Sequence, residues 1–270
     1  MCSSTVFAVQ EIKKDTSYTV NSSFLKYKKK FPAIEIVKPK QFNNVTKKAT
    51  IKYKTLENRN LYLDAFINDS DKNPAVILVH GGGWKSGNKS HMKLLAQVLA
   101  SKGYSCFVIE YRLSDEAKYP AAIFDVKKAI QFIKENAKEF HVDSTKIAIL
   151  GASSGAQMAT LIGTTNNNLK FEENHQNQVS STVNAIINLD GILAFKHPES
   201  KEGKVASLWL GGTFNEKPTV WQEASALTHN IYNQVETFPN SPHTFWLFHP
   251  YFNKTVHYIT KFLDKTLKNK

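Results

Sequence analysis

Two short stretches carry residue types suited to nucleophilic chemistry. Ser153 lies between two glycines in "ILGASSGAQMA", the Gly-x-Ser-x-Gly pattern of a serine held at a sharp strand-to-helix turn. Earlier in the chain, "HGGGW" (80–84) places three glycines in a row. Glycines leave their backbone N–H groups unobstructed, so this loop could bind an oxygen that becomes negatively charged. Together the motifs predict acyl transfer through a covalent serine intermediate.

The oxyanion site is expected to consist of backbone N–H groups from both motifs. We assign it to Gly82, Gly83 and Ser154, because donors from the glycine loop and from the residue after the nucleophile converge in such sites. Trp84 is expected to border the substrate pocket. His80 is expected to orient the loop by hydrogen bonding and not to act as the base.

Nine histidines compete for the role of general base. Where a serine follows a strand in this way, an acidic residue that assists the base comes next along the chain. The histidine base follows that acid, in the loop after the last strand. His243 in "NSPHTFW" has that position, whereas His249, His229 and His197 fit it less well. A neutral imidazole at His243 would accept the Ser153 proton and later return it to the leaving alcohol.

The acid of such a triad is not where the pattern requires it. Residues 191–232 contain no β-branched run ending in Asp. Asp190, which ends the apolar segment 183–191, is the best substitute, although it also fits a simple turn in "LDGIL". Glu236 would have to reach the imidazole sideways. Two interpretations therefore stay open: the acid has moved to Asp190, or the acid is missing.

Apolar runs and helical spacing predict the elements that position these residues. The expected strands are 49–55 and 61–67 as a hairpin, then 74–80, 104–112, 146–153, 183–191 and a short strand around 233–239. The expected helices are 89–102, 120–140, 155–163 and 251–267. Strands that alternate with helices predict an α/β fold with a mostly parallel sheet and an antiparallel hairpin at its N-terminal edge.

The domain organisation is expected to be simple. Residues 1–45 are polar and lysine-rich, and we interpret them as an N-terminal arm. Residues 46–270 are interpreted as a single domain. Loss of the acid-bearing strand would leave one edge of its sheet unpaired.

Several stretches resemble a known family. "HGGGW", "EYRLSDEAKYPAAIFDV" and "DSTKIAILGASSGAQMA" resemble the hormone-sensitive-lipase-like esterase branch of the α/β-hydrolase superfamily. "NLDGILAFKHPES", "WLGGTF" and "FPNSPHTFWLFHP" are similar to bacterial esterases of plant-polysaccharide degradation. The resemblance implies an α/β-hydrolase fold and a serine esterase acting on small-molecule or polysaccharide esters.

Two other functions compete with the esterase. One is a degenerate, weakly active or non-catalytic α/β-hydrolase that binds ligands without a triad acid. The other is a serine peptidase of the same fold, which is less favoured because "HGGGW" is typical of the esterase branch. Glu110, Arg112, Asp115 and Glu116 are interpreted as a structural ion-pair network. The aromatic residues that follow His243 fit either a pocket border or core packing.

Composition excludes several other classes. The net charge of +12 comes from scattered lysines without a nucleic-acid-binding motif, so we expect a solvated surface and no nucleic-acid partner. No apolar run approaches the ~20 residues of a membrane helix. Two cysteines exclude a disulfide scaffold and a cysteine-built zinc site. "HPES" and "SPH" lack metal-ligand spacing, so neither metal nor cofactor is expected.

The N-terminus has part of a secretory pattern. "MCSSTVFAVQEIKK" contains the small-residue ending Val6-Phe7-Ala8, but it lacks the charged start and apolar segment of a complete signal peptide. The resemblance implies a periplasmic or secreted location. The sequence assigns no oligomeric state.

Overall fold

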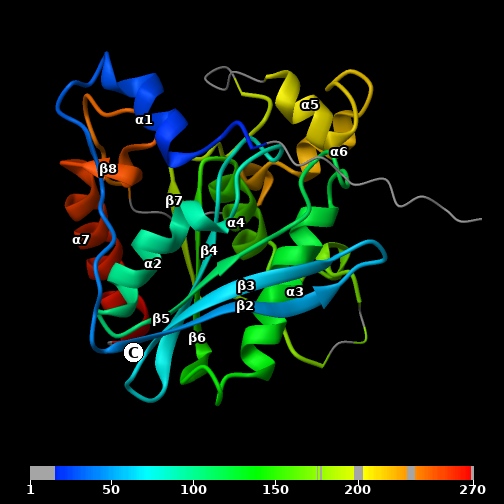
Figure 1. The fold of residues 1–270 in the computed structure, drawn as a ribbon. Helices are drawn as coiled ribbons and strands as arrows, with labels where there is room; N and C mark the ends of the chain where they lie inside the picture. The colour runs from blue at the N-terminus through cyan, green and yellow to red at the C-terminus, as the bar shows by residue number, and fades with distance from the viewer. Residues whose placement is uncertain (1–15, 175, 177, 198–202, 230–234, 269–270) are drawn as a thin grey trace, which may run out of the picture.

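The central feature of the protein is a six-stranded sheet in the order β2-β3-β5-β4-β6-β7 (Figure 1). The computed structural model describes residues 16–268 except 175, 177, 198–202 and 230–234. The strands are β1 (Glu35–Ile36), β2 (Val45–Thr55), β3 (Asn60–Asn68), β4 (Asn73–Val79), β5 (Ser105–Ile109), β6 (Val142–Ala152), β7 (Ala185–Leu189) and β8 (Phe248–His249). The short β1 and β8 form a separate antiparallel pair.

Strand directions agree with the α/β prediction. β4 pairs in parallel with β5 and β6, and β6 pairs in parallel with β7. β2 and β3 form the expected antiparallel hairpin, and β3 joins it to β5. The carboxyl ends of the parallel strands therefore meet at one edge of the sheet, where ligands bind in open α/β folds.

Helices cover both faces of the sheet (Figure 1). They are α1 (Val20–Lys28), α2 (Lys93–Ala100), α3 (Ala121–Glu135), α4 (Ser154–Thr164), α5 (Lys204–Leu210), α6 (Pro218–Glu223) and α7 (Tyr251–Leu263). Val76 and Leu78 of β4 face the core beneath α2 and α7, whereas Ala75 and Ile77 face the core beneath α3 and α4. This alternation follows from the two-residue period of a strand. Within the described chain, no helix is long and apolar enough to cross a membrane.

A buried ion-pair network joins β2 to α3. Asp125 is fully buried and accepts hydrogen bonds from the Arg112 guanidinium at 2.7 and 2.8 Å and from Lys54 Nζ at 2.8 Å. Arg59 pairs with Glu116 at 2.6 Å. The interpretation of Arg112 and Glu116 as structural residues is therefore confirmed.

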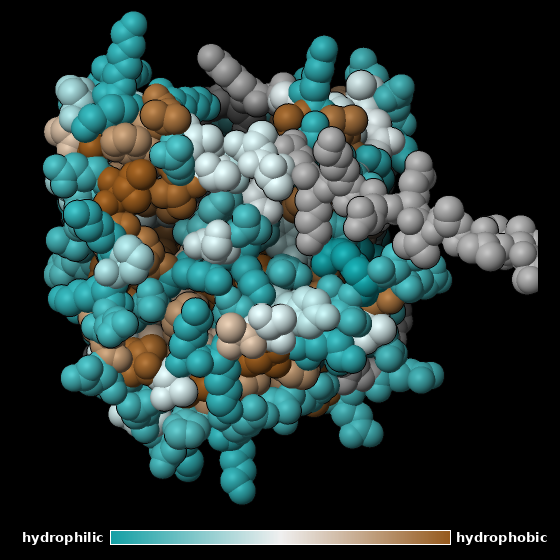
Figure 2. All heavy atoms as spheres, viewed as in Figure 1, coloured by the Kyte–Doolittle hydropathy of each residue, from teal (hydrophilic) through white to brown (hydrophobic). Residues whose placement is uncertain are grey.

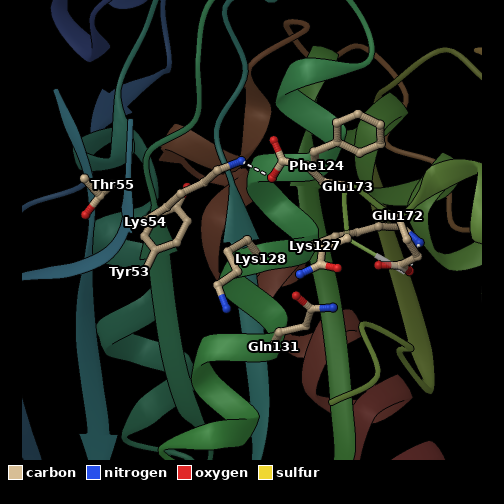
Figure 3. A pocket seen from close by; sticks show the side chains of 10 residues that line it. Tyr53, Lys54, Thr55, Phe124, Lys127, Lys128, Gln131, Glu172 and Glu173 are labelled. Carbon is tan, nitrogen blue, oxygen red and sulfur yellow. Dashed lines mark hydrogen bonds and ion pairs between the residues drawn. The ribbon is translucent and has the colours of Figure 1, made fainter. Parts of the chain in front are cut away.

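A cavity of about 310 Å³ lies beside this network (Figure 3). Lys54 extends from β2 and pairs with Glu173, and Lys127 extends from α3 and donates to Glu172 at 2.8 Å. The buried ammonium groups of Lys54 and Lys127 beside this cavity are thus neutralised by neighbouring carboxylates. Buried charges paired in this way are a structural feature of the fold.

The segment predicted as the last strand is not one. Residues 235–239 are irregular, and residues 233 and 234 lie outside the described chain. Val235 is 75% exposed. Among the described strands β7 ends the sheet, and residues 235–239 do not pair with its free edge. The alternating sequence of this segment therefore does not form a strand.

Residues 16–45 of the N-terminal arm are more ordered than their sequence indicates. Thr19 caps α1: its hydroxyl accepts the Ser22 N–H at 2.9 Å, and the Ser22 hydroxyl accepts the Thr19 N–H at 2.9 Å. The Phe24 ring packs 6.1 Å from the Phe248 ring. The division of the chain into 1–45 and 46–270 stays a prediction.

Candidate active site

Ser153 occupies a strained turn between β6 and α4. Its backbone has φ 54° and ψ −121°, a conformation that residues other than glycine rarely adopt. A Cβ on Gly155 would overlap the carbonyl oxygens of Val79 and His80. A Cβ on Gly151 would likewise overlap the backbone of Gly155. Gly155 is therefore required by the close approach of this turn to β4, and Gly151 by the close approach of α4 to β6.

Ser153, His243 and Asp190 form a continuous hydrogen-bonded relay. Ser153 Oγ lies 2.9 Å from His243 Nε2. His243 Nδ1 lies 2.7 Å from Asp190 Oδ2. A carboxylate only accepts hydrogen bonds, so Nδ1 donates to Asp190 and Nε2 is left to accept the serine proton. Nucleophile, base and acid have these same relations in a serine triad.

Asp190 is held out from the sheet by a turn. Its φ of 56° lies in the left-handed region, and Asn188 Oδ1 accepts the Gly191 N–H at 2.8 Å. The turn interpretation and the acid interpretation are thus compatible in the same residue. The side chains of Asp190 and His243 are 49% and 44% exposed, so water reaches the pair. Glu236 belongs to the irregular segment 235–239.

The glycine loop borders a cavity of about 430 Å³ together with Ser153 and His243. Gly82 and Gly83 have φ values of 127° and 62°, which side-chain-bearing residues rarely adopt. Among the residues that the structure describes, none accepts a hydrogen bond from the N–H of Gly82, Gly83 or Ser154. Ser154 also begins α4, whose N-terminus favours negative charge. These N–H groups are available to an oxyanion.

His80 lies beneath the loop and does not reach the nucleophile. It is 2% exposed, and burial lowers its pKa to about 3. The Gly81 carbonyl lies 2.8 Å from His80 Nδ1, which must therefore carry the proton and donate it. The Tyr111 hydroxyl donates to the His80 carbonyl at 2.9 Å. Through its imidazole and its carbonyl, His80 thus ties the glycine loop to Tyr111, which follows β5.

Trp84 does not border the cavity as expected. Its side chain is 7% exposed and stacks on Trp209 at 5.0 Å between ring centroids. The indole N–H donates to Gln157 Oε1 at 3.1 Å. Trp84 has a φ of 58°, so the turn directs its ring under the loop and into the core. The prediction for Trp84 is corrected: it supports the site from within.

The other predicted candidates lie elsewhere. His249 belongs to β8 opposite Glu35, and the His229 ring packs on Phe171. His197 is exposed. Of the aromatic residues after His243, Phe245, Trp246, Phe248 and Phe252 are buried in the core. In the described ranges no three His, Cys, Asp or Glu side chains gather as a metal site.

One wall of the cavity was not predicted from the sequence. It is formed by α1 and the residues before it: Ser17, Tyr18, Ser22, Ser23, Lys26 and Tyr27. Thr244, next to His243, also lines the cavity. Spacing relative to Ser153 does not mark the α1 residues, because their position depends on how the arm packs on the body.

The fold and this arrangement of side chains define an α/β-hydrolase. Residues 60–238 match the BD-FAE family model, which covers more than half of the chain. The chain belongs to the BD-FAE family. This agrees with the resemblance to the hormone-sensitive-lipase-like and carbohydrate-esterase branch that the motifs indicated.

Similar proteins carry esterase names. The chain is 26% identical over 160 residues to esterase LipC of Mycobacterium tuberculosis, covering 57% of this chain and 40% of LipC. It is 32% identical over 123 residues to the probable carboxylic ester hydrolase LipM of the same species, covering 45% of this chain and 28% of LipM. The chain thus spans less than half the length of these relatives.

Solved structures of similar fold include two esterase-related proteins. A bifunctional GH43-CE protein of Bacteroides eggerthii is 29% identical with a TM-score of 0.62, over 68% of this chain and 29% of that chain. The apo form of Thermogutta terrifontis esterase 2 has a TM-score of 0.63 at 21% identity, over 84% and 96% of the two chains. The second similarity establishes the fold alone.

Proposed function

We propose that the protein is a serine ester hydrolase in which Ser153 is the nucleophile, His243 the general base and Asp190 the acid. The observation that carries this proposal is the relay of hydrogen bonds at 2.9 and 2.7 Å. Relatives named esterases and carboxylic ester hydrolases support the same class of reaction.

The reaction would proceed in two halves. Ser153 Oγ attacks the ester carbonyl carbon while its proton moves to His243 Nε2. The carbonyl oxygen becomes an oxyanion, which the N–H groups of Gly82, Gly83 and Ser154 stabilise. Collapse breaks the bond to the alcohol, which takes the proton from His243 and leaves an acyl-enzyme. Water then attacks the acyl carbon while His243 accepts its proton. The bond from the acyl carbon to Ser153 Oγ breaks as His243 returns the proton to Oγ, and the carboxylic acid is released.

The substrate class is an ester of a small molecule or polysaccharide. One structural relative at 29% identity carries a GH43-CE title, and another solved relative is titled a carbohydrate esterase from gut microbiota. Carbohydrate esters are therefore included among the proposed substrates. The reaction as written uses only groups of this chain and water.

A second candidate function is a weakly active or non-catalytic binding protein. The exposure of Asp190 and His243, 49% and 44%, favours it, because water competes for the hydrogen bonds that a triad needs.

Hydrolysis of p-nitrophenyl acetate by the purified protein and by Ser153→Ala separates the two candidates. We expect the substitution to remove at least about 99% of the enzymatic rate, since a triad without its nucleophile loses several orders of magnitude. Covalent labelling by a fluorophosphonate should be lost in parallel. Equal rates and equal labelling in both proteins would sink the esterase proposal and favour the binding protein.

A further inference from the structure

The cavity above Ser153 is polar on the side of α1. The side chains that α1 and the preceding residues contribute are Ser17, Tyr18, Ser22, Ser23, Lys26 and Tyr27. All of them except Lys26 carry a hydroxyl. The wall is thus suited to a group that forms hydrogen bonds, and it holds one permanent charge.

This wall is held in place by packing and capping. The Tyr18 ring contacts the His91 ring edge-on at 4.6 Å, just before the capped start of α1. Burial raises the pKa of Tyr18 to about 12, so its hydroxyl stays protonated. The Phe24 ring packs on Phe248 at the other side of the helix. Lys26 therefore projects from a helix whose position relative to Ser153 is defined.

Lys26 has no carboxylate partner among the described residues. Its ammonium lies 5.2 Å from the centre of the Tyr27 ring. No described carboxylate lines the cavity. Asp190 lies on the far side of the imidazole, because it binds Nδ1 of His243 whereas Nε2 faces Ser153. A cavity with one cation and no anion attracts a negatively charged group.

Beyond the glycine loop, outside the residues that line the cavity, the surface of α5 is apolar. Val205 Cγ1 would lie 3.0 Å from a Cβ placed on Gly83, so α5 closely covers this side of the glycine loop. Val205 and Leu208 are 38% and 47% exposed on α5. Figure 2 shows the resulting hydrophobic patch over α5, with a paler surface between it and α1.

The direction of proton transfer decides which half of an ester lies on which side. His243 returns its proton to the leaving alcohol, so the alcohol must lie next to His243. His243 and Thr244 line the same cavity as α1. The alcohol therefore faces α1, and the acyl group points toward Val205.

We propose, building on the esterase function proposed above, that the enzyme prefers esters whose alcohol carries a carboxylate, and that Lys26 recognises this carboxylate. The acceptable substrates are acylated hydroxy acids and acylated acidic sugars with a small apolar acyl group. Lys26 is a specificity-determining residue that acts on binding and takes no part in proton transfer.

The test compares two acetate esters that differ in the charge of the alcohol: 4-acetoxybenzoate, which is anionic, and 4-acetoxybenzamide, which is neutral. Each kcat/KM is divided by the rate of hydroxide-catalysed hydrolysis of the same ester, which removes the difference in leaving-group reactivity. The ratio of the anionic to the neutral value is the charge preference. A preference for a carboxylate on the acyl side is tested by comparing phenyl hydrogen succinate, which is anionic, with phenyl butyrate, which is neutral.

We expect Lys26→Met to lower the charge preference about threefold, the effect of one partly solvated ion pair, through KM more than kcat. Lys26→Arg should restore it and Lys26→Glu should reverse it. Salt at about 0.5 M should weaken the wild-type preference by screening. Lys30→Met is the matched control, because Lys30 lies over the Phe31 ring away from the cavity. It should leave the preference unchanged.

Two results would overturn the inference: a wild-type enzyme that hydrolyses both acetates equally well, or a preference that survives Lys26→Met. A preference for the acid on the acyl side would also contradict it. Because the preference is a ratio, partial unfolding of a variant does not alter it. If hydrolysis does not depend on Ser153, the esterase proposal itself fails, whereas Ser153-dependent hydrolysis without a charge preference removes only the role of Lys26.

Discussion

At the scale of single residues, the hydrogen bond between Asp190 and His243 is the most unusual contact of the site, since both side chains are nearly half exposed. In a buried triad the carboxylate holds the imidazole in one tautomer and stabilises the imidazolium. Water around an exposed pair weakens that Coulombic stabilisation. The short distance of 2.7 Å still orients the ring. We therefore expect orientation to be the main contribution of Asp190.

Asp190→Asn tests this contribution. Replacing the triad carboxylate by an amide lowers kcat by about 10⁴ in a serine protease, and we expect a smaller loss here, roughly 10²- to 10³-fold, because water partly replaces the carboxylate. The measurement is kcat for p-nitrophenyl acetate. Asp115→Asn, at an exposed aspartate outside the site, is the control and should retain the full rate. An unchanged rate in Asp190→Asn would mean that the acid of this site is not Asp190.

Ser153 and His243 can be predicted as candidates from the sequence because motif, spacing and order along the chain point to them together. Asp190 was ambiguous because "LDG" fits both a turn and an acid, and the sequence does not show where a turn directs its side chain. Trp84 was misplaced for a related reason. A φ of 58° sends its ring inward, and no sequence rule for the glycine loop predicts that direction.

At the scale of elements, the turn at Ser153 depends on the close contact of α4 with β4. Gly155 lies in the first turn of the helix, where the chain passes against the carbonyl groups of Val79 and His80. A side chain at this position must displace the backbone of β4 or move Ser153. Either movement disturbs the alignment of Ser153 with His243, so stability and activity are coupled at this turn.

Gly155→Ala is expected to lower both the stability of the fold and the rate of ester hydrolysis. Overpacking of this kind costs about 1–3 kcal/mol or more, which corresponds to a decrease in Tm of roughly 3–10 °C in a chain of this size. Differential scanning fluorimetry and p-nitrophenyl acetate hydrolysis provide the measurements. Gly203→Ala is the matched control, since the nearest atom to its added Cβ is 3.9 Å away. Equal Tm values for the two variants would contradict the proposed contact.

The parallel strands and their helices could be predicted because each is marked by an apolar run or a helical stripe. α1 could not be, since "VNSSFLKYK" is mostly polar and a short isolated helix is marginal. Its stability comes from Phe24 and from the cap at Thr19, which act only once the arm has packed. The segment 235–239 shows the converse: its sequence favours a strand, but it does not pair with the free edge of β7.

At the scale of the whole molecule, two buried histidines link the stability of the fold to pH. His80 under the glycine loop and His91 beside Tyr18 are 2% and 6% exposed, and their rings meet edge-on at 6.3 Å. Burial lowers the pKa of His80 to about 3 and that of His91 to about 4. Between pH 6.5 and 4 the unfolded chain therefore binds more protons than the folded protein, so stability falls as the pH is lowered.

We expect the free energy of unfolding to drop by about 2 kcal/mol per histidine between pH 7 and pH 5, since an unfolded histidine titrates near 6.5 and each pKa unit corresponds to about 1.4 kcal/mol. Urea denaturation at the two pH values measures it. Asp64 does not contribute in this window. Burial raises its pKa, but hydrogen bonds from Lys89 and Lys93 bring it down to about 2, so its stabilisation is lost only below pH 3.8.

His91→Phe isolates one of the two histidines. The phenyl ring can keep the edge-on contacts with Tyr18 and His80, and it removes the group that takes up a proton on unfolding. The loss of stability between pH 7 and pH 5 should therefore shrink by about half while the stability at pH 7 changes little. A loss as large as that of the wild-type protein would show that the acid sensitivity arises elsewhere. The same histidines support the glycine loop and the start of α1. We therefore expect acidification to loosen the glycine loop together with the α1 side of the cavity, where Lys26 lies.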